Sequence, residues 1–203
     1  MTENERQQWR RQLRTRRQQL SAIEQREASE ALSQRLLTFT EQLPQVHEVA
    51  VFLANDSEID LHPYVEALWQ RNIKTVVPVL HPFSSGHLLF MRYAKDTVMR
   101  PNRFAIPEPE LACPNVVPLA KIDLLFAPLV GFDGHGNRLG MGGGFYDRTL
   151  SSWFAGRYPN LHVAGVAHDC QYVEQLPAAA WDIPLPRVFT PTRVWQFEPT
   201  IQR

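Results

Sequence analysis

The sequence predicts an α/β fold, a mostly parallel sheet flanked by helices on both faces in three αβα layers. Short runs rich in β-branched residues, such as VAVFLA at 49–54, are apolar nearly throughout, as strands buried on both faces are. Segments with helical character alternate with these runs along the chain. The 203 residues, of which 44% are hydrophobic, are enough for one full core.

The amino-terminal residues 3–42 are predicted to be helical, because they contain no Gly or Pro and are rich in Gln, Arg, Glu, Leu and Ala. We expect a break near Ser21, which can form a capping box with Glu24 three residues later. Residues 1–42 are thus expected to be an Arg-rich helical segment that packs on a single domain spanning residues 1–203.

The next elements form a βαβ unit. A strand at 49–54, a helix from Asp60 to about Arg71 and a strand at 74–80 follow one another, which favours parallel pairing of the two strands. We expect a further strand at 87–93, in a hairpin across the turn residues 84–86, and irregular structure in the Pro-rich residues 96–118. The remaining elements expected are strands at 122–133, 161–167 and 187–192 and a helix at 144–154.

The composition limits the classes of partner. The 21 basic and 21 acidic residues give no formal net charge, which argues against a protein that coats nucleic acid. The most apolar stretch, 124–132, is far shorter than the roughly 20 residues of a membrane helix, and the first residues lack the apolar run of a secretory signal. Cys113 and Cys170 are too few for a disulfide framework and are expected to be small buried hydrophobes. We expect a cytoplasmic monomer without nucleic-acid or membrane partners.

One segment is dense in glycine. Seven of the ten glycines lie between Gly131 and Gly144, after a predicted strand and before a predicted helix. Ligands of open α/β sheets bind beyond the carboxyl ends of the strands, and the first free N–H groups of a helix attract phosphate. The segment therefore predicts a phosphate-binding loop, although it is not a Walker loop and lacks the G-x-G-x-x-G spacing. A flexible surface turn is the alternative.

Arginines form a stripe on the first helix. Arg6, Arg10 and Arg14 are four residues apart and share one face, and Arg17 lies close to it. Guanidinium groups can bind phosphate oxygens through paired N–H donors. By spacing alone, a solvated charged face is the favoured interpretation, with phosphate binding and RNA binding as the functional alternatives.

Acidic residues follow the predicted strands. Glu58 and Asp60 come just after the strand at 49–54 and could accept hydrogen bonds from a polar ligand, although Asp60 could instead cap the next helix. Asp147 lies in the first turn after the glycine segment, and Asp182 comes late in the chain. If these two converge, they would supply oxygen ligands for a magnesium ion that bridges phosphates. The seven histidines show no metal-ligand spacing, and His168 is expected to be satisfied by local contacts.

Together these residues resemble the 5-formyltetrahydrofolate cyclo-ligase family, also called 5,10-methenyltetrahydrofolate synthetase, from about Arg6 to Thr190. The most specific match is GNRLGMGGGFYDR at 136–148, against the family pattern N-R-L-G-x-G-x-G-Y-Y-D. Supporting matches are RQQWR at 6–10, EID at 58–60, FAIPEP at 104–109 and the late D-x-P with a Thr at 182–190. The chain departs from the family at Arg6 (usually Lys), Leu61 (usually Thr), Phe145 (usually Tyr) and Pro186 (often Asp).

The resemblance implies an enzyme that converts 5-formyltetrahydrofolate to 5,10-methenyltetrahydrofolate with ATP, releasing ADP and phosphate. ATP is then a co-substrate, the reduced folate is the other substrate, and Mg²⁺ is the cofactor. The γ-phosphoryl group activates the formyl oxygen, and N10 of the folate then attacks the formyl carbon. Phosphoryl transfer depends chiefly on positioning and charge neutralisation, so no nucleophilic side chain is expected.

The resemblance also implies the site residues. Catalytic roles fall on Arg10, Arg138 and Asp147, and the magnesium-linked pair is Asp147 and Asp182. The residues implied for ATP are Arg6, Arg10, Arg138, Leu139, Gly140, Met141, Gly142, Gly143, Gly144, Phe145 and Tyr146. The residues implied for folate are Leu53, Glu58, Met141, Gly142, Gly143, Gly144 and Phe145, with Glu58 holding the pterin.

Two other classes of function are carried as alternatives. One is an α/β enzyme that handles a sugar phosphate or CoA, because similar sheets host isomerases and transferases. The other is a binding module whose Arg-rich helix docks RNA.

Overall fold

The computed structural model describes residues 3–102, 106–179 and 181–197. Within these ranges the helices are α1 (Glu3–Gln18), α2 (Ala22–Gln42), α3 (His62–Gln70) and α4 (Phe145–Phe154), and short 3-10 helices are η1 (Cys113–Asn115), η2 (Leu119–Lys121) and η3 (Asp169–Gln171). The strands are β1 (Glu48–Ala50), β2 (Lys74–Leu80), β3 (Leu88–Tyr93), β4 (Met99–Pro101), β5 (Pro107–Pro109), β6 (Val116–Val117), β7 (Leu124–Pro128), β8 (Gly131–Asp133), β9 (Arg138–Leu139), β10 (His162–Val166), β11 (Tyr172–Val173), β12 (Arg187–Phe189) and β13 (Val194–Gln196).

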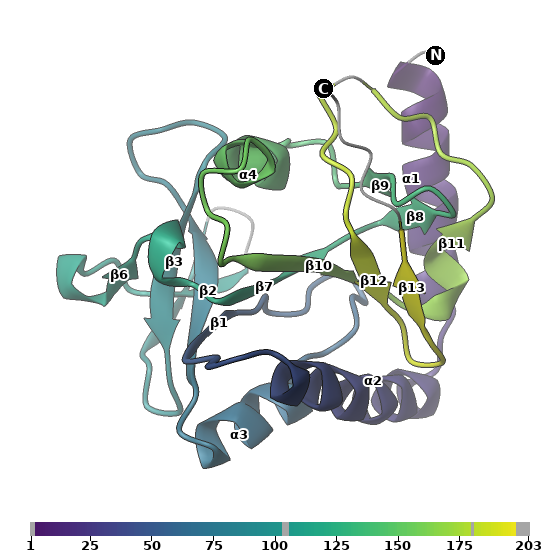
Figure 1. The fold of residues 1–203 in the computed structure, drawn as a ribbon. Coiled ribbons are helices and arrows are strands. Elements are labelled where there is room, and N and C mark those ends of the chain that lie inside the picture. Colours follow the sequence, from purple (N-terminus) through teal and green to yellow (C-terminus); the bar gives the residue numbers. More distant parts are fainter. Residues whose placement is uncertain (1–2, 103–105, 180, 198–203) are drawn as a thin grey trace.

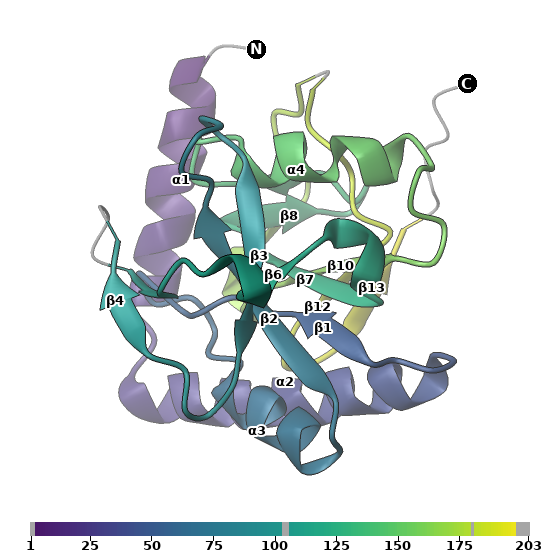
Figure 2. The ribbon, with the colours of Figure 1, turned by 90° about the vertical axis from the view of Figure 1, so that its left-hand side faces the viewer.

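The main sheet has eight strands in the order β13-β12-β10-β7-β1-β2-β3-β6. The five strands from β12 to β2 pair in parallel, whereas β13 at one edge and β3 and β6 at the other pair antiparallel. Helices cover both faces (Figures 1 and 2), so the predicted α/β class is confirmed.

Two apolar layers hold the helices to the sheet. Helices α2 and α3 bury Leu36 and Tyr64 against one face, together with Phe126 and other side chains of the central strands. Helix α4 buries Leu150 against the opposite face. Helix α1 stands apart from these layers, beside β8, β9 and β11 (Figure 1), where Leu13 is fully buried in a smaller cluster.

The predicted break between the first two helices is confirmed. Ser21 is the N-cap of α2, and its backbone N–H donates to Glu24 Oε2 at 2.8 Å while its side chain accepts from the Glu24 N–H. This capping box satisfies the first free N–H groups of α2, which lets the chain change direction between α1 and α2.

The predicted strand at 122–133 is wrong as one element. It divides into β7, in the main sheet, and β8, in a separate sheet with β9 and β11. The carbonyls of Leu129 and Val130, between the two strands, accept hydrogen bonds from the Gln171 side chain at 2.6 and 3.0 Å. Because side-chain amides satisfy this backbone, the chain can leave the main sheet without burying unpaired polar groups.

Smaller differences concern short elements and exposure. Strand β1 ends at Ala50, earlier than predicted, and residues 96–118 contain the short strands β4, β5 and β6. Cys113 is exposed, against expectation, and Cys170 is half-buried, with neither in a disulfide. Phe104 and Ala105, from the FAIPEP match at 104–109, lie outside the described residues. Among the helices that the structure describes, none is long and apolar enough to cross a membrane.

Candidate functional site

A cavity of about 790 Å³ lies between the first half of α1, the amino-terminal end of α4 and the residues near position 182. It brings together side chains that are far apart in the sequence, such as Arg6 and Asp182, which are separated by 176 residues. Its lining consists of Glu3, Arg6, Arg10, His87, Gly140, Gly142, Gly144, Asp147, Arg148, Ser151, Phe154, Trp181, Asp182 and Ile183.

Arg6 and Asp182 form a bidentate ion pair in this cavity. Arg6 Nη1 donates to Asp182 Oδ2 at 2.6 Å and Nη2 donates to Oδ1 at 3.0 Å. The same Nη1 also donates to the Pro177 carbonyl at 2.7 Å, and both side chains are largely buried. The pair joins α1 to the late segment of the chain.

Arg10 lies one turn further along the same wall. Its Nε donates to the Gly140 carbonyl at 2.9 Å, and its Nη1 donates to Glu3 Oε1 at 2.7 Å. Gly142 has a φ of +100°, and a side chain there would lie 3.4 Å from the Arg10 guanidinium carbon. This distance is ordinary van der Waals contact, so glycine at 142 is favoured by the left-handed backbone and not by the approach of Arg10.

The glycine segment ends at the start of α4. Gly144 is the N-cap, with a φ of +65°, and no side chain caps the helix. The helix dipole and the amino-terminal N–H groups of α4 thus point toward the cavity side of Gly144, which suits an anion.

Asp147, in the first turn of α4, accepts from two groups. Arg138 Nη2 donates to Asp147 Oδ1 at 2.6 Å, and the Ile183 N–H donates to the same oxygen at 3.3 Å. Arg138 is buried and does not line the cavity, and its Nη1 has no hydrogen-bond partner among the described residues. A buried guanidinium nitrogen without a partner fits an anionic ligand that supplies an acceptor.

The cavity also fits a magnesium ion that arrives with phosphate. Asp147 and Asp182 both line it, and the Ile183 N–H that binds Asp147 follows Asp182 directly in the chain. No group of three or more His, Cys, Asp or Glu side chains in the described part of the chain could hold a metal by itself. Magnesium is commonly held by one or two carboxylates together with substrate phosphates, so two carboxylates are sufficient.

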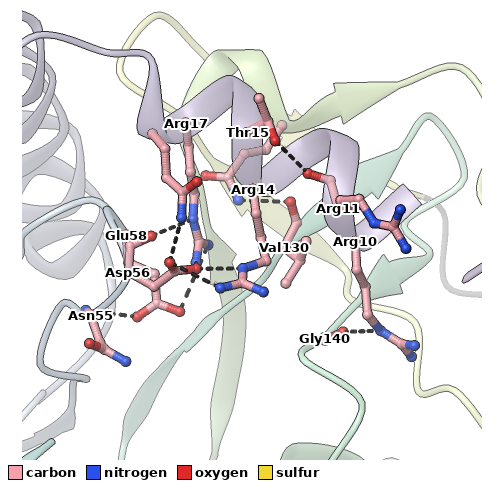
Figure 3. Close-up of polar contacts among 12 residues, drawn as sticks. Arg10, Arg11, Arg14, Thr15, Arg17, Asn55, Asp56, Glu58, Val130 and Gly140 are labelled. Carbon is pink, nitrogen blue, oxygen red and sulfur yellow. Dashed lines mark hydrogen bonds and ion pairs between the residues drawn. The ribbon is translucent and has the colours of Figure 1, made fainter. Parts of the chain in front are cut away.

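A second polar cluster surrounds Asp56, at the other end of α1 (Figure 3). Three α1 side chains donate to its carboxylate: Arg14 Nε at 2.7 Å, Arg17 Nη2 at 2.7 Å and Gln18 Nε2 at 2.6 Å. The guanidinium of Arg14 is the largest cause that lowers the pKa of Asp56 to about 2. Asp56 and Ser57 both have left-handed backbone, with φ of +52° and +59°. Such residues cost about 1–3 kcal/mol each, which the three donors to Asp56 help to offset.

Glu58 follows this turn and is mostly buried. Its Oε2 accepts from the Asn55 N–H at 3.2 Å, and its Oε1 lies 3.9 Å from Arg17 Nη1. Burial raises the pKa of Glu58 to about 7, although the charge of Arg17 lowers it. Desolvation thus outweighs the single distant cation, and the carboxyl is poised to change charge near neutral pH.

The other predicted site residues lie around these two clusters. Leu139 is buried in the small cluster with Leu13, whereas Met141 is exposed. Leu53 packs, half-buried, against the main core, and Tyr146 lies close enough to Glu58 for that charge, after burial, to raise the tyrosine pKa. Leu61, a departure from the family pattern, is a buried core residue, and Asp60 accepts from the His62 N–H at the start of α3.

The arginine stripe is not a solvated face. Arg6, Arg10 and Arg14 are half-buried and Arg17 is fully buried, and each donates to a protein acceptor, so the favoured interpretation by spacing is wrong for these four. His168 is buried as well, with its backbone N–H bonded to Gln171 Oε1. Its Nε2 has no partner among the described residues, so the expected local satisfaction is incomplete.

Several cavity residues escaped the sequence reasoning. Ser151 and Phe154 follow Asp147 on the helix, and the spacing 147, 151, 154 would have placed both on the Asp147 face of α4. Arg148 is the last residue of the 136–148 motif match, but no role was assigned to it. His87 and Trp181 reach the cavity only through the tertiary fold, and no local pattern in the sequence marks them.

Comparison with known proteins identifies close relatives. Residues 2–191 match the model of the 5-formyltetrahydrofolate cyclo-ligase family. The chain is 46% identical over 185 residues to the 5-formyltetrahydrofolate cyclo-ligase of Escherichia coli K12, covering 91% of this chain and 100% of the relative. It is 45% identical to the Haemophilus influenzae enzyme of the same name, covering 91% and 97%.

Solved structures agree with the fold. The NMR structure of Aquifex aeolicus 5,10-methenyltetrahydrofolate synthetase superposes with a TM-score of 0.76 at 26% identity, covering 98% of this chain and 95% of that one. A Mycoplasma pneumoniae 5,10-methenyltetrahydrofolate synthetase gives a TM-score of 0.73 at 24% identity, covering 92% and 98%.

Proposed function

The chain belongs to the 5-formyltetrahydrofolate cyclo-ligase family, and from this premise we propose which of its residues bind each substrate. Its activity is the ATP-dependent conversion of 5-formyltetrahydrofolate to 5,10-methenyltetrahydrofolate. The recognition made from the sequence motifs is thereby confirmed, and the alternatives of a sugar-phosphate or CoA enzyme and of an RNA-binding module are set aside.

We propose that the cavity between α1 and α4 binds the triphosphate of ATP. One observation carries this proposal: a single cavity is lined by cations, glycines and carboxylates. They are Arg6, Arg10, Gly140, Gly142, Gly144, Asp147 and Asp182. Arg6 and Arg10 would donate to phosphate oxygens, together with the amino-terminal N–H groups of α4. Arg138 lies outside the cavity lining, and its unpaired Nη1 would donate to phosphate once Asp147 leaves Arg138 for the metal.

Asp147 and Asp182 would hold the magnesium ion, which neutralises charge on the phosphates when it is bound. In the structure these carboxylates are paired with Arg138 and Arg6. Binding of MgATP would therefore exchange partners: the carboxylates turn to the metal and the arginines turn to phosphate. The exchange keeps every charge compensated before and after binding, which avoids leaving a buried charge unpaired.

We propose that the folate lies on the Glu58 side of the glycine segment, with the pterin edge donating to the Glu58 carboxylate. Adjacent N–H donors on a pterin match the two oxygens of a carboxylate. The formyl oxygen attacks the γ-phosphorus and ADP leaves, which gives an imidate-type phosphate. The N10 lone pair then attacks the formyl carbon, phosphate leaves with the former formyl oxygen, and N10 loses its proton as the ring closes.

Substrate kinetics test these assignments. With methenyl absorbance as the readout, we expect Glu58→Gln to raise the KM for 5-formyltetrahydrofolate by about tenfold or more, since a charge-assisted hydrogen bond contributes roughly 1.5–3 kcal/mol. The KM for ATP should change little. An equal rise in the KM for both substrates would contradict the proposed division of the site.

The place of action and assembly are proposals too. We propose that the protein acts in the cytoplasm, which the two unpaired cysteines support because reducing compartments keep thiols free. We propose in addition that it is a monomer.

A further inference from the structure

Arg17 is a fully buried cation that the reaction described above does not use. Its side chain has no exposure to solvent, and it extends from α1 to the turn that precedes Glu58 (Figure 3). A buried charge is costly unless it is paired, so its partners indicate what it does.

The partners of Arg17 all belong to that turn or to the end of a central strand. Its Nη2 donates to Asp56 Oδ2 at 2.7 Å, and its Nε donates to the Asp56 carbonyl at 2.8 Å. Its Nη1 lies 3.9 Å from Glu58 Oε1 and 3.4 Å from the carbonyl of Leu129. Arg17 thus binds both the side chain and the backbone of Asp56, and its Nη1 lies beside Glu58.

The backbone of this turn needs such support. Asp56 and Ser57 are consecutive non-glycine residues in the left-handed region, where a side chain is crowded against its own backbone. The turn is closed by the Glu58 N–H, which donates to the Asn55 carbonyl at 2.9 Å. The direction in which Glu58 leaves the turn therefore depends on these two residues staying left-handed.

Three charged or titratable groups, each from a different segment, interact electrostatically with Glu58. Arg17 of α1 stabilises its ionised form, Asp56 of its own turn opposes that form, and Tyr146 of α4 faces it as a neutral hydroxyl. Arg17 is the cation among these three groups, and its Nη1 lies 3.9 Å from Glu58 Oε1. In a buried setting, solvent screens such a charge only weakly.

We propose that Arg17 is a positioning residue of the folate site: it fixes the turn through Asp56 and supplies the positive charge that keeps Glu58 ionised for the pterin. This inference rests on the proposed role of Glu58. It also assigns different roles to the two halves of α1, because Arg6 and Arg10 serve the cavity and Arg17 serves the carboxylate that would hold the other substrate.

The test measures the KM for both substrates from pH 6 to 9 in Arg17→Gln, with Arg14→Gln as the matched control. Arg14 also donates to Asp56, but no contact joins it to Glu58 in the described residues. We expect Arg17→Gln to raise the folate KM by about tenfold at pH 7, because Glu58 loses its counter-charge and therefore ionises at a higher pH. The folate KM of this variant should return toward the wild-type value as the pH rises. Arg17→Lys, which keeps the charge, should lie between this variant and the wild type.

Asp56→Asn gives a second, independent reading that does not require Arg17 to be removed. It should raise the folate KM, because the turn loses the carboxylate that binds Arg17. It should also shift the pH dependence of the folate KM to lower pH, because a negative charge beside Glu58 is removed and Glu58 ionises more readily. A role in folding alone would not move the two pH profiles in opposite directions.

The outcomes separate this inference from the proposed function. If Glu58→Gln leaves the folate KM unchanged, the folate assignment itself is wrong. If Glu58→Gln raises it but Arg17→Gln raises both KM values equally, or by the same factor at every pH, then Arg17 is only structural and the inference is overturned. If Arg17→Gln does not fold, an Asp56→Asn enzyme with the wild-type pH profile overturns it instead.

Discussion

Arg6 and Arg10, in the first half of α1, line an open cavity, whereas Arg14 and Arg17, in the second half, bind the carboxylate of Asp56. Their partners differ in kind. Arg10 binds an exposed glutamate and a loop carbonyl, which a phosphate can replace. Arg17 binds both the side chain and the backbone of Asp56 in a buried turn. A cation with replaceable partners can serve a ligand, and a cation with fixed partners can shape the protein.

The largest effect is expected at the cavity end. Asp182→Asn should lower kcat by roughly 100-fold or more and raise the magnesium concentration needed for half-maximal rate, because preorganised charge at phosphates is worth several kcal/mol. Asp96→Asn, at an exposed position, is the control. Unchanged kcat and magnesium dependence in Asp182→Asn would break the assignment of the cavity to MgATP.

A smaller effect is expected for Arg10→Ala. We expect the KM for ATP to rise by about 10- to 100-fold, the loss of a charge-assisted contact worth roughly 1.5–3 kcal/mol. The melting temperature should change by less than about 2 °C, because the partners of Arg10 are accessible to water. Exposed Arg11→Ala should alter neither quantity. A large fall in melting temperature would make Arg10 a structural residue like Arg17.

The sequence could predict some of this contrast. Spacing placed four arginines near one helix face, the capping box located the break at Ser21, and the glycines located the loop before α4. Which arginine serves which role could not be read locally, because Asp182 and Asp56 lie 176 and 39 to 42 residues from their partners. The family motifs supplied the pairing with ATP and folate, whereas periodicity alone favoured a solvated face that the structure does not have.

At the end of α1 that contacts the Asp56 turn, one substitution should raise stability and weaken binding. Glu58 has a pKa of about 7 in the folded protein, above its ordinary value of 4.5, so its contribution to stability is present at low pH and is lost as the pH rises from about 4.5 to 7. Glu58→Gln should therefore stabilise the protein at pH 8, on the order of 1–3 kcal/mol, while it weakens folate binding. Urea unfolding at pH 8 and pH 5 measures this. Destabilisation at pH 8 would mean that pairing with Arg17 outweighs burial.

The smallest effect is expected at His168, which lies within electrostatic reach of Arg17. Burial, followed by the charge of Arg17, lowers the pKa of His168 to about 4, whereas an exposed histidine titrates near 6.5. In this pH range His168 is protonated in the unfolded chain but stays neutral in the folded protein, so the free energy of unfolding should fall as the pH drops from 6.5 toward 4.

His168→Gln removes that proton site and keeps a polar side chain. Between pH 7.5 and pH 5 we expect the wild type to lose on the order of 1–2 kcal/mol more stability than the variant, as measured by urea unfolding at both pH values. Asp56 does not contribute in this window, because its stabilising effect is lost only as the pH falls from 3.8 to about 2. An identical pH dependence in both proteins would show that His168 accepts its proton in the folded state, and the turn end of α1 would then be open to water like the cavity end.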